Sequence, residues 1–201
     1  MSENPFDRDG LRRQLERSRF ERALEVCESM VAHRVLLTNS ELARLNNILL
    51  GRQPTDDPWR QGPMTSTLRS GREVQFSVMA DPKVSLRDRL HQATAIAEAG
   101  KAPDGTEHAP EAVIDAAVDV YVNMVLSHYF QDGNRRKAVL AAHYFLDGNR
   151  RTAVLAAHYF LRRYGLPVSG LAIHEMGLGD VRNPEQVELL RQTLRNMAKL
   201  R

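Results

Sequence analysis

The sequence predicts a mostly α-helical protein with one short β-hairpin. Three features indicate this class: stretches rich in Ala, Leu, Val and Arg, helix-start and helix-stop residues at their ends, and one segment of alternating apolar residues. With 201 residues, 42% of them hydrophobic, the chain is long enough for one domain with a buried core. Its net charge of +3 is too small to indicate binding to a specific nucleic acid.

Two helices are expected in the first quarter of the chain. The first has a charged amphipathic pattern, and we assign it to an N-terminal helical extension over residues 1–35. It contains the single cysteine, Cys27, which we expect on a buried face and without a catalytic role, because nothing nearby would activate it. Thr38 and Glu41 form a capping box that begins the second helix, and Gly51 is its natural end.

The hairpin is expected in the middle of the chain. Residues 52–65 contain three prolines and an Asp pair, which favour a loop. In residues 66–78 a Ser-Gly pair lies at the centre, and apolar residues alternate after it. This pattern is typical of two short strands joined by a turn, and Pro82 ends it.

The remaining elements are expected to be helices. Residues 84–99 have helical spacing, and residues 111–127 are apolar over so wide an arc that we expect this helix near the centre of the core. From Gly165 onward the pattern predicts a turn, a short helix and a terminal amphipathic helix over residues 184–200.

Between these helices lies an internal repeat. Residues 128–142 and 143–157 are two copies of one segment, His-Tyr-Phe-x-Asp-Gly-Asn-Arg-Arg-x-Ala-Val-Leu-Ala-Ala. The copies differ only at the fourth position, Gln or Leu, and at the tenth, Lys or Thr. The period is too short for a solenoid, and only two full copies are present, so a tandem duplication explains the repeat best.

One copy contains the residue types that phosphate chemistry needs. An Asp-Gly turn lets backbone amides approach a ligand, and the helix after it offers free N–H groups and a positive dipole end. Two Arg add forked donors, Asp132 can hold Mg²⁺, and His128 can take a proton from a hydroxyl. Taken singly, such a turn is usually only a turn, and such a His is usually a core residue.

The combination His-x-Phe-x-Asp-Gly-Asn-x-Arg resembles the signature of the Fic/Doc family. The resemblance implies a Fic-like helical bundle over residues 36–201, with the hairpin at 66–78 as the flap on which a target protein docks as an added strand. It also implies ATP as substrate, Mg²⁺ as cofactor, and transfer of AMP to a hydroxyl of the target protein.

The resemblance further implies a role for each matching residue. His128 would be the general base, Phe130 the structural anchor and Asp132 the Mg²⁺ ligand. The nucleotide's phosphates would be bound by four residues: Gly133, Asn134, Arg135 and Arg136. The second copy offers the alternative set: His143 as base, Asp147 as metal ligand, and Gly148, Asn149, Arg150 and Arg151 for the phosphates.

The chain also departs from the Fic pattern, which leaves three functions open. Fic enzymes usually have Gly where this chain has Arg135, whereas the Doc branch has Lys followed by Arg-Thr-Ala, which the second copy resembles more closely. The alternatives to AMP transfer are therefore a Doc-like kinase that transfers the γ-phosphate and a degenerate Fic fold that binds without turnover.

Many Fic enzymes are held inactive by a Glu that pairs with a second Arg of the motif. Here Val139 stands at that position, and we find no segment of the required form. We therefore expect no internal Glu bonded to Arg136. Any restraint on this toxin-like protein would come from a partner similar to an antitoxin.

Only one copy can follow the upstream helix as the family requires. We expect the first, because the strongly apolar helix 111–127 leads directly into His128. The second copy is then absorbed either as a helix that runs on from Lys137 through Gly148 or by a break in the chain. Fifteen extra helical residues would add about 22 Å, which favours exchange with a neighbouring molecule and a swapped homodimer.

The sequence also predicts a cytoplasmic location without membrane contact. The N-terminus has no apolar signal core, no apolar run reaches the length of a membrane span, and a lone cysteine fits a reducing compartment. His91, His108 and His174 have no partners at metal-ligand spacing, so we expect surface or structural roles for them.

Overall fold

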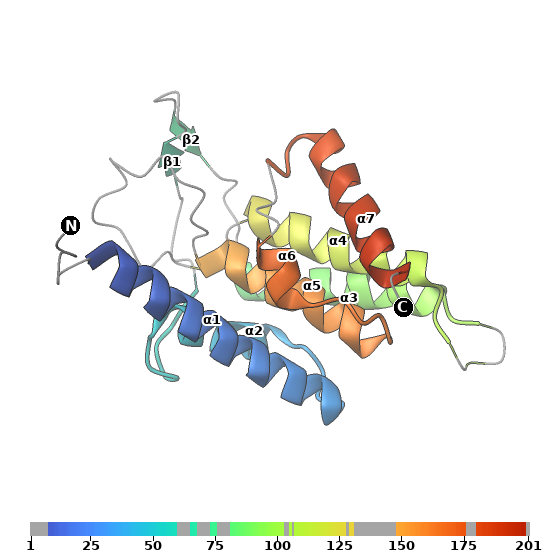
Figure 1. Ribbon diagram of the computed structural model, residues 1–201, viewed down its shortest axis with the longest axis horizontal. Coiled ribbons are helices and arrows are strands. Elements are labelled where there is room, and N and C mark those ends of the chain that lie inside the picture. Colours follow the sequence, from blue (N-terminus) through green and yellow to red (C-terminus); the bar gives the residue numbers. More distant parts are fainter. Residues whose placement is uncertain are drawn as a thin grey trace, which may run out of the picture.

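The computed structural model describes residues 8–59, 65–67, 73–75, 81–102, 105, 107–127, 129–130, 148–175 and 180–199. Within these ranges it contains seven helices and one pair of antiparallel strands (Figure 1). The expected class, a mostly α-helical bundle, is confirmed, and the two strands lie where the hairpin is expected. The helices are α1 (Arg8–Ala32), α2 (Asn39–Leu50), α3 (Pro82–Ala99), α4 (Pro110–Ser127), α5 (Gly148–Arg163), α6 (Gly170–Glu175) and α7 (Pro184–Lys199).

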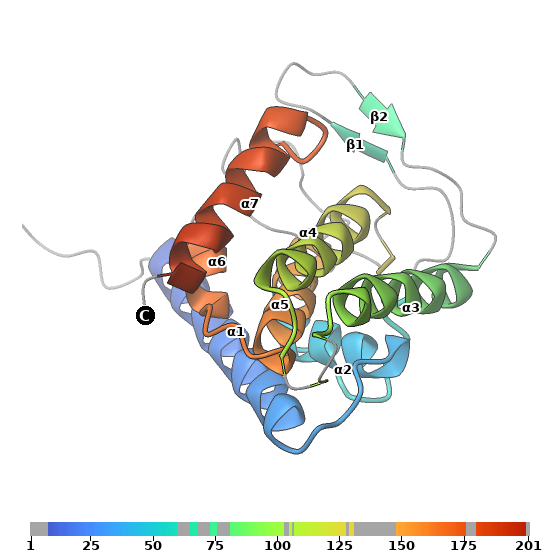
Figure 2. The same ribbon diagram turned by 90° about the vertical axis from the view of Figure 1, so that its right-hand side faces the viewer.

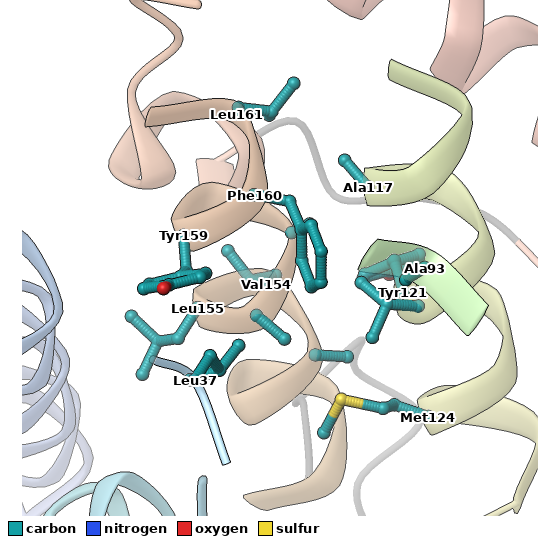
Figure 3. Close-up of a cluster of buried hydrophobic side chains, with 14 of the residues drawn as sticks. Leu37, Ala93, Ala117, Tyr121, Met124, Val154, Leu155, Tyr159, Phe160 and Leu161 are labelled. Atoms are coloured by element: carbon teal, nitrogen blue, oxygen red, sulfur yellow. The ribbon is translucent and has the colours of Figure 1, made fainter. Parts of the chain in front are cut away.

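Helix α5 is the central element of the fold. It contacts α1, α2, α4 and α6, and Figure 2 shows it between α4 on one side and α1 on the other. In Figure 3, Phe160 faces Tyr121 of α4, while Leu155 and Tyr159 point to the opposite side, where Leu37 lies. All residues from 151 to 161 are buried, as expected for a helix enclosed by others.

The first and last residues expected to cap α2 are confirmed. Thr38 is the N-cap, with its Oγ1 accepting a hydrogen bond from the Glu41 N–H at 3.2 Å, and Gly51 is the C-cap with a positive φ of 65°. Glu41 also forms an ion pair with Arg44 at 3.0 Å. The positive φ explains why glycine suits this position, since other residues adopt it at a steric cost.

Helix α3 begins two residues earlier than the spacing predicts. The cause is Asp81, whose carboxylate accepts hydrogen bonds from the N–H groups of Lys83 at 2.8 Å and Val84 at 3.2 Å. Pro82 occupies the first helical turn, where its missing N–H has no helical partner to lose. An Asp-Pro pair is thus a helix start here rather than the end of the hairpin.

The N-terminal helix shares the core of the other helices. Phe20, Cys27 and Met30 of α1 are buried in the same cluster as residues of α2, α4 and α5. Burial raises the pKa of the Cys27 thiol to about 12, so the thiol stays protonated at neutral pH. The expected buried position of Cys27 is confirmed, while the boundary at residue 35 stays a prediction.

The two strands are β1 (Thr65–Thr67) and β2 (Glu73–Gln75). They pair antiparallel, with Ser66 opposite Val74, and they lie to one side of the helices in Figure 1. The rest of the expected flap, at 68–72 and 76–78, lies outside the described residues. None of the helices in the described ranges combines the length and the apolar composition needed to span a bilayer.

Candidate functional site

The structure describes part of each predicted copy of the motif. Phe130 of the first copy and the start of α5 in the second copy, Gly148 to Arg151, are placed. Eight predicted site residues lie outside the described ranges, and their roles stay predictions: His128, Asp132, Gly133, Asn134, Arg135, Arg136, His143 and Asp147.

Phe130 is fully buried shortly after the end of α4. Its ring packs on the ring of Trp59, with 4.8 Å between centroids, and the backbones of the two residues form an isolated β-bridge. The contact ties the segment after α4 to the loop after α2. Phe130 thus has the surroundings of an anchor, and Trp59 is a contact that no sequence signal indicated.

Asn149, in the first turn of α5, is bonded to the backbone of Phe130 in both directions. Its Oδ1 accepts a hydrogen bond from the Phe130 N–H at 2.8 Å, and its Nδ2 donates to the Phe130 carbonyl oxygen at 2.9 Å. The Asn149 side chain is buried, so these bonds satisfy polar groups that water does not reach. This pair of bonds fixes the start of α5 against the segment that follows α4.

The two bonded residues come from different copies of the repeat. They are 19 residues apart, whereas Phe130 and Asn134 of the first copy are four apart, and the difference is one repeat. We expected the first copy to supply both residues. The structure instead takes the asparagine from the second copy, and the contacts farther along α5 give the physical reason.

Thr152 fixes the first turn of α5 to α2. Its Oγ1 donates to the Gly148 carbonyl oxygen at 2.6 Å and accepts from Asn46 Nδ2 at 3.1 Å. Both Thr152 and Asn46 are completely buried. The residue at the same position of the first copy is Lys137, whose ammonium group would be buried here away from water at a large cost.

Close packing also requires glycine at the start of α5. A Cβ on Gly148 would lie 2.9 Å from Asn46 Nδ2 and 3.0 Å from a methyl carbon of Leu50. Asn46 itself had a signal in the sequence, because it is a polar residue at a helical spacing from Leu42 and Leu49, where an apolar residue is expected.

The two arginines at the start of α5 have different surroundings. Arg150 is half-buried, and its Nε donates to the hydroxyl of Tyr121 on α4 at 3.2 Å. Arg151 is only 8% exposed, and its charge adds to burial in lowering the pKa of His174 on α6. The His174 ring stacks on Phe20, with 4.3 Å between centroids.

The start of α5 is therefore a positively charged end of a helix. The first N–H groups of any α-helix lack intrahelical acceptors, and the helix dipole places positive charge there. The first turn contains Arg150 and Arg151 and no acidic residue. This arrangement favours an anion such as a phosphate group.

A second polar cluster lies farther along α5. His158 is buried, with Nε2 2.9 Å from Glu28 Oε1, and Arg162 Nε lies 3.3 Å from the same oxygen. Burial lowers the pKa of His158, while Glu28 opposes that shift. The cluster joins α5 to α1.

The three histidines expected on the surface or in structural roles have them. His91 is exposed, and His108 lies 3.4 Å from Glu98 and packs against Tyr164. His174 stacks on Phe20. The expectation for these residues is confirmed.

Together the fold and this site define a helical domain whose central helix begins with a Gly-Asn-Arg-Arg sequence bonded to a buried aromatic residue. No protein-family model and no curated protein sequence matches the chain. Among solved structures it resembles a Fic-domain-containing signalling protein from Bacteroides thetaiotaomicron, with a TM-score of 0.59 and 18% identity. The match covers 92% of this chain and 70% of that one. At this level of identity the likeness shows the fold, so the chain has a Fic-type fold, as the motif implied.

Proposed function

We propose that this protein transfers the AMP group of ATP to a hydroxyl side chain of a target protein. The observation that supports the proposal is the bonded pair of Phe130 and Asn149 at the positively charged start of α5, in a chain with a Fic-type fold. Phe and Asn are two of the six specified positions of the Fic/Doc signature, and here they lie together in the core.

In this proposal the phosphates of ATP bind at the first turn of α5. The helix dipole and the guanidinium groups of Arg150 and Arg151 neutralise their charge, and Gly148 lets the backbone approach them. The target hydroxyl attacks the α-phosphorus, His128 or His143 accepts its proton, and the bond to pyrophosphate breaks. Bound Mg²⁺ would neutralise charge on the phosphates and leaving group.

The metal ligand in this proposal is a single carboxylate. Asp147 immediately precedes Gly148, and Asp132 is its counterpart in the first copy. One carboxylate with water and phosphate oxygens is a usual set for Mg²⁺ at a nucleotide. The strand pair β1–β2 would hold the target segment as an added strand, because its backbone offers an edge for pairing.

A Doc-like kinase is the second candidate, and one observation favours it. The helix that packs in the core reads Arg150-Arg151-Thr152-Ala153, and the Arg-Thr-Ala part is what the Doc branch has. Arg150 stands where Fic enzymes usually have Gly, so its side chain competes with the outer phosphates for space. In that orientation of ATP the γ-phosphate would be transferred.

The test uses ATP labelled on either the α or the γ phosphate, with Mg²⁺ and cell lysate. α-label on proteins supports AMP transfer, and γ-label without α-label replaces it with kinase activity. Absence of both labels contradicts both enzymes and favours a binding protein. A control carrying His128→Ala and His143→Ala together removes both candidate bases and should give no label from either ATP.

A further inference from the structure

We propose that the phosphate-binding loop of this protein is composite, with Phe130 from the first copy of the repeat and Gly148, Asn149 and Arg151 from the second. We further infer that the Thr at position 152, in place of the Lys of the first copy, selects this register, in which the second copy and not the first forms the start of α5. The phosphate role of Arg151 rests on the proposed function, whereas the register does not.

Only one asparagine can be bonded to the backbone of Phe130 in this way. The N–H and the carbonyl oxygen of Phe130 are both bonded to the side chain of Asn149, at 2.8 and 2.9 Å. Asn134 therefore cannot make the same pair of bonds. The residue that fixes the loop to the anchor is the one from the second copy.

The start of α5 accommodates the second copy better than the first. The two copies are identical from the Gly of the motif onward except at the tenth position. There Thr152 is completely buried between the Gly148 carbonyl and Asn46 Nδ2. Lys137 in that place would bring a longer side chain and a charge into a space that a hydroxyl fills.

The C-terminal end of α5 also fits the second copy better than the first. Arg162 pairs with Glu28 of α1 at 3.3 Å, and the residue one repeat earlier is Asp147, which would repel that carboxylate. Gly165 follows the helix with a φ of +89°, a conformation that suits glycine, and Arg150 stands one repeat earlier. Both ends of the helix thus favour the second copy.

The consequence is a reassignment of the predicted phosphate ligand. Arg151, two residues after Asn149, is carried by a helix whose register is fixed at both ends. In the composite loop it takes the role that the resemblance gave to Arg136.

The register is tested on the full chain with matched pairs of variants, because each substitution in one copy has a twin in the other. Asn149→Ala should lower the midpoint of thermal unfolding by roughly 5–10 °C, since it leaves two buried backbone groups without partners. Asn134→Ala should shift it by less than about 2 °C. An equal shift in both, or a larger one for Asn134→Ala, overturns the composite loop.

The role of Thr152 in selecting the register is tested in the same way. Thr152→Lys should lower the midpoint by roughly 10 °C or more, because it buries a charge, and Lys137→Thr should shift it by less than about 2 °C. Failure of Thr152→Lys to fold, when Lys137→Thr folds, supports the proposal equally. Thr152→Ser, which keeps the hydroxyl, should retain most of the stability of the unmodified protein. Equal shifts of the midpoint for Lys137→Thr and Thr152→Lys would overturn the role of Thr152.

The phosphate ligand is tested by ATP binding, measured by calorimetry. Arg151→Ala should weaken binding at least tenfold, and Arg136→Ala should change it less than twofold. The reverse order overturns the reassignment. If the unmodified protein binds no ATP, the proposed function fails, and the unfolding data on the Asn pair still decide the register.

Discussion

Replacing Thr152 with Val should lower the free energy of unfolding by about 2–4 kcal/mol. Val keeps the shape of Thr but removes the hydroxyl that donates to the Gly148 carbonyl oxygen and accepts from Asn46 Nδ2. Asn46 is completely buried, so its Nδ2 loses a partner that water cannot replace, which costs about 1–3 kcal/mol. The lost bond to Gly148 adds about 1 kcal/mol.

Urea unfolding followed by circular dichroism measures the loss, and Thr94→Val is the matched control. Thr94 Oγ1 donates to the Leu90 carbonyl oxygen at 2.9 Å, but the residue is exposed on α3, so the loss from Thr94→Val should stay below about 1 kcal/mol. In a double-mutant cycle, Asn46→Leu with Thr152→Val should cost less than the sum of the single changes, because both polar partners are then gone. A loss no larger than that of Thr94→Val, or strictly additive effects, would refute the reasoning.

Three further predictions follow from other parts of the molecule. Burial lowers the pKa of His158 below its ordinary 6.5, so the unfolded chain binds a proton more readily than the folded chain. The contribution of His158 to stability is therefore full above pH 6.5 and is lost as the pH falls from there through the lowered pKa. The urea midpoint should be lower at pH 5 than at pH 7.5, and His158→Gln should reduce this difference. Deleting residues 131–145 keeps the Thr of α5, whereas deleting residues 138–152 leaves Lys137 in its place. The midpoint of thermal unfolding, measured by calorimetry, should be clearly lower for the second deletion, and adding Lys137→Thr to that deletion should restore it. Equal midpoints for the two deletions would mean that the tenth position of the repeat has no influence. Finally, Arg150→Gly should raise α-label relative to γ-label in the transfer assay, because it frees space for the outer phosphates; an unchanged ratio would mean that this side chain does not decide the transferred group.

Local sequence signals were sufficient to predict where most helices lie. The cap at Thr38, the stop at Gly51 and the apolar helix before residue 128 depend on residues three or four positions apart, which the sequence displays directly. The start of α3 was missed although its signal was local: the Asp81 carboxylate caps the helix, and proline suits the first turn. The error came from interpreting a proline as a break.

The sequence by itself determined that a Fic-type motif was present, and it determined the helical class. It could not determine which copy forms α5, because both copies contain the same motif residues and the same local helix pattern. That choice depends on Asn46, 106 residues before Thr152, and on Glu28, 134 residues before Arg162. Only the packing of α1 and α2 against α5 brings these groups together, and there a buried hydroxyl is accepted where a buried ammonium group is not.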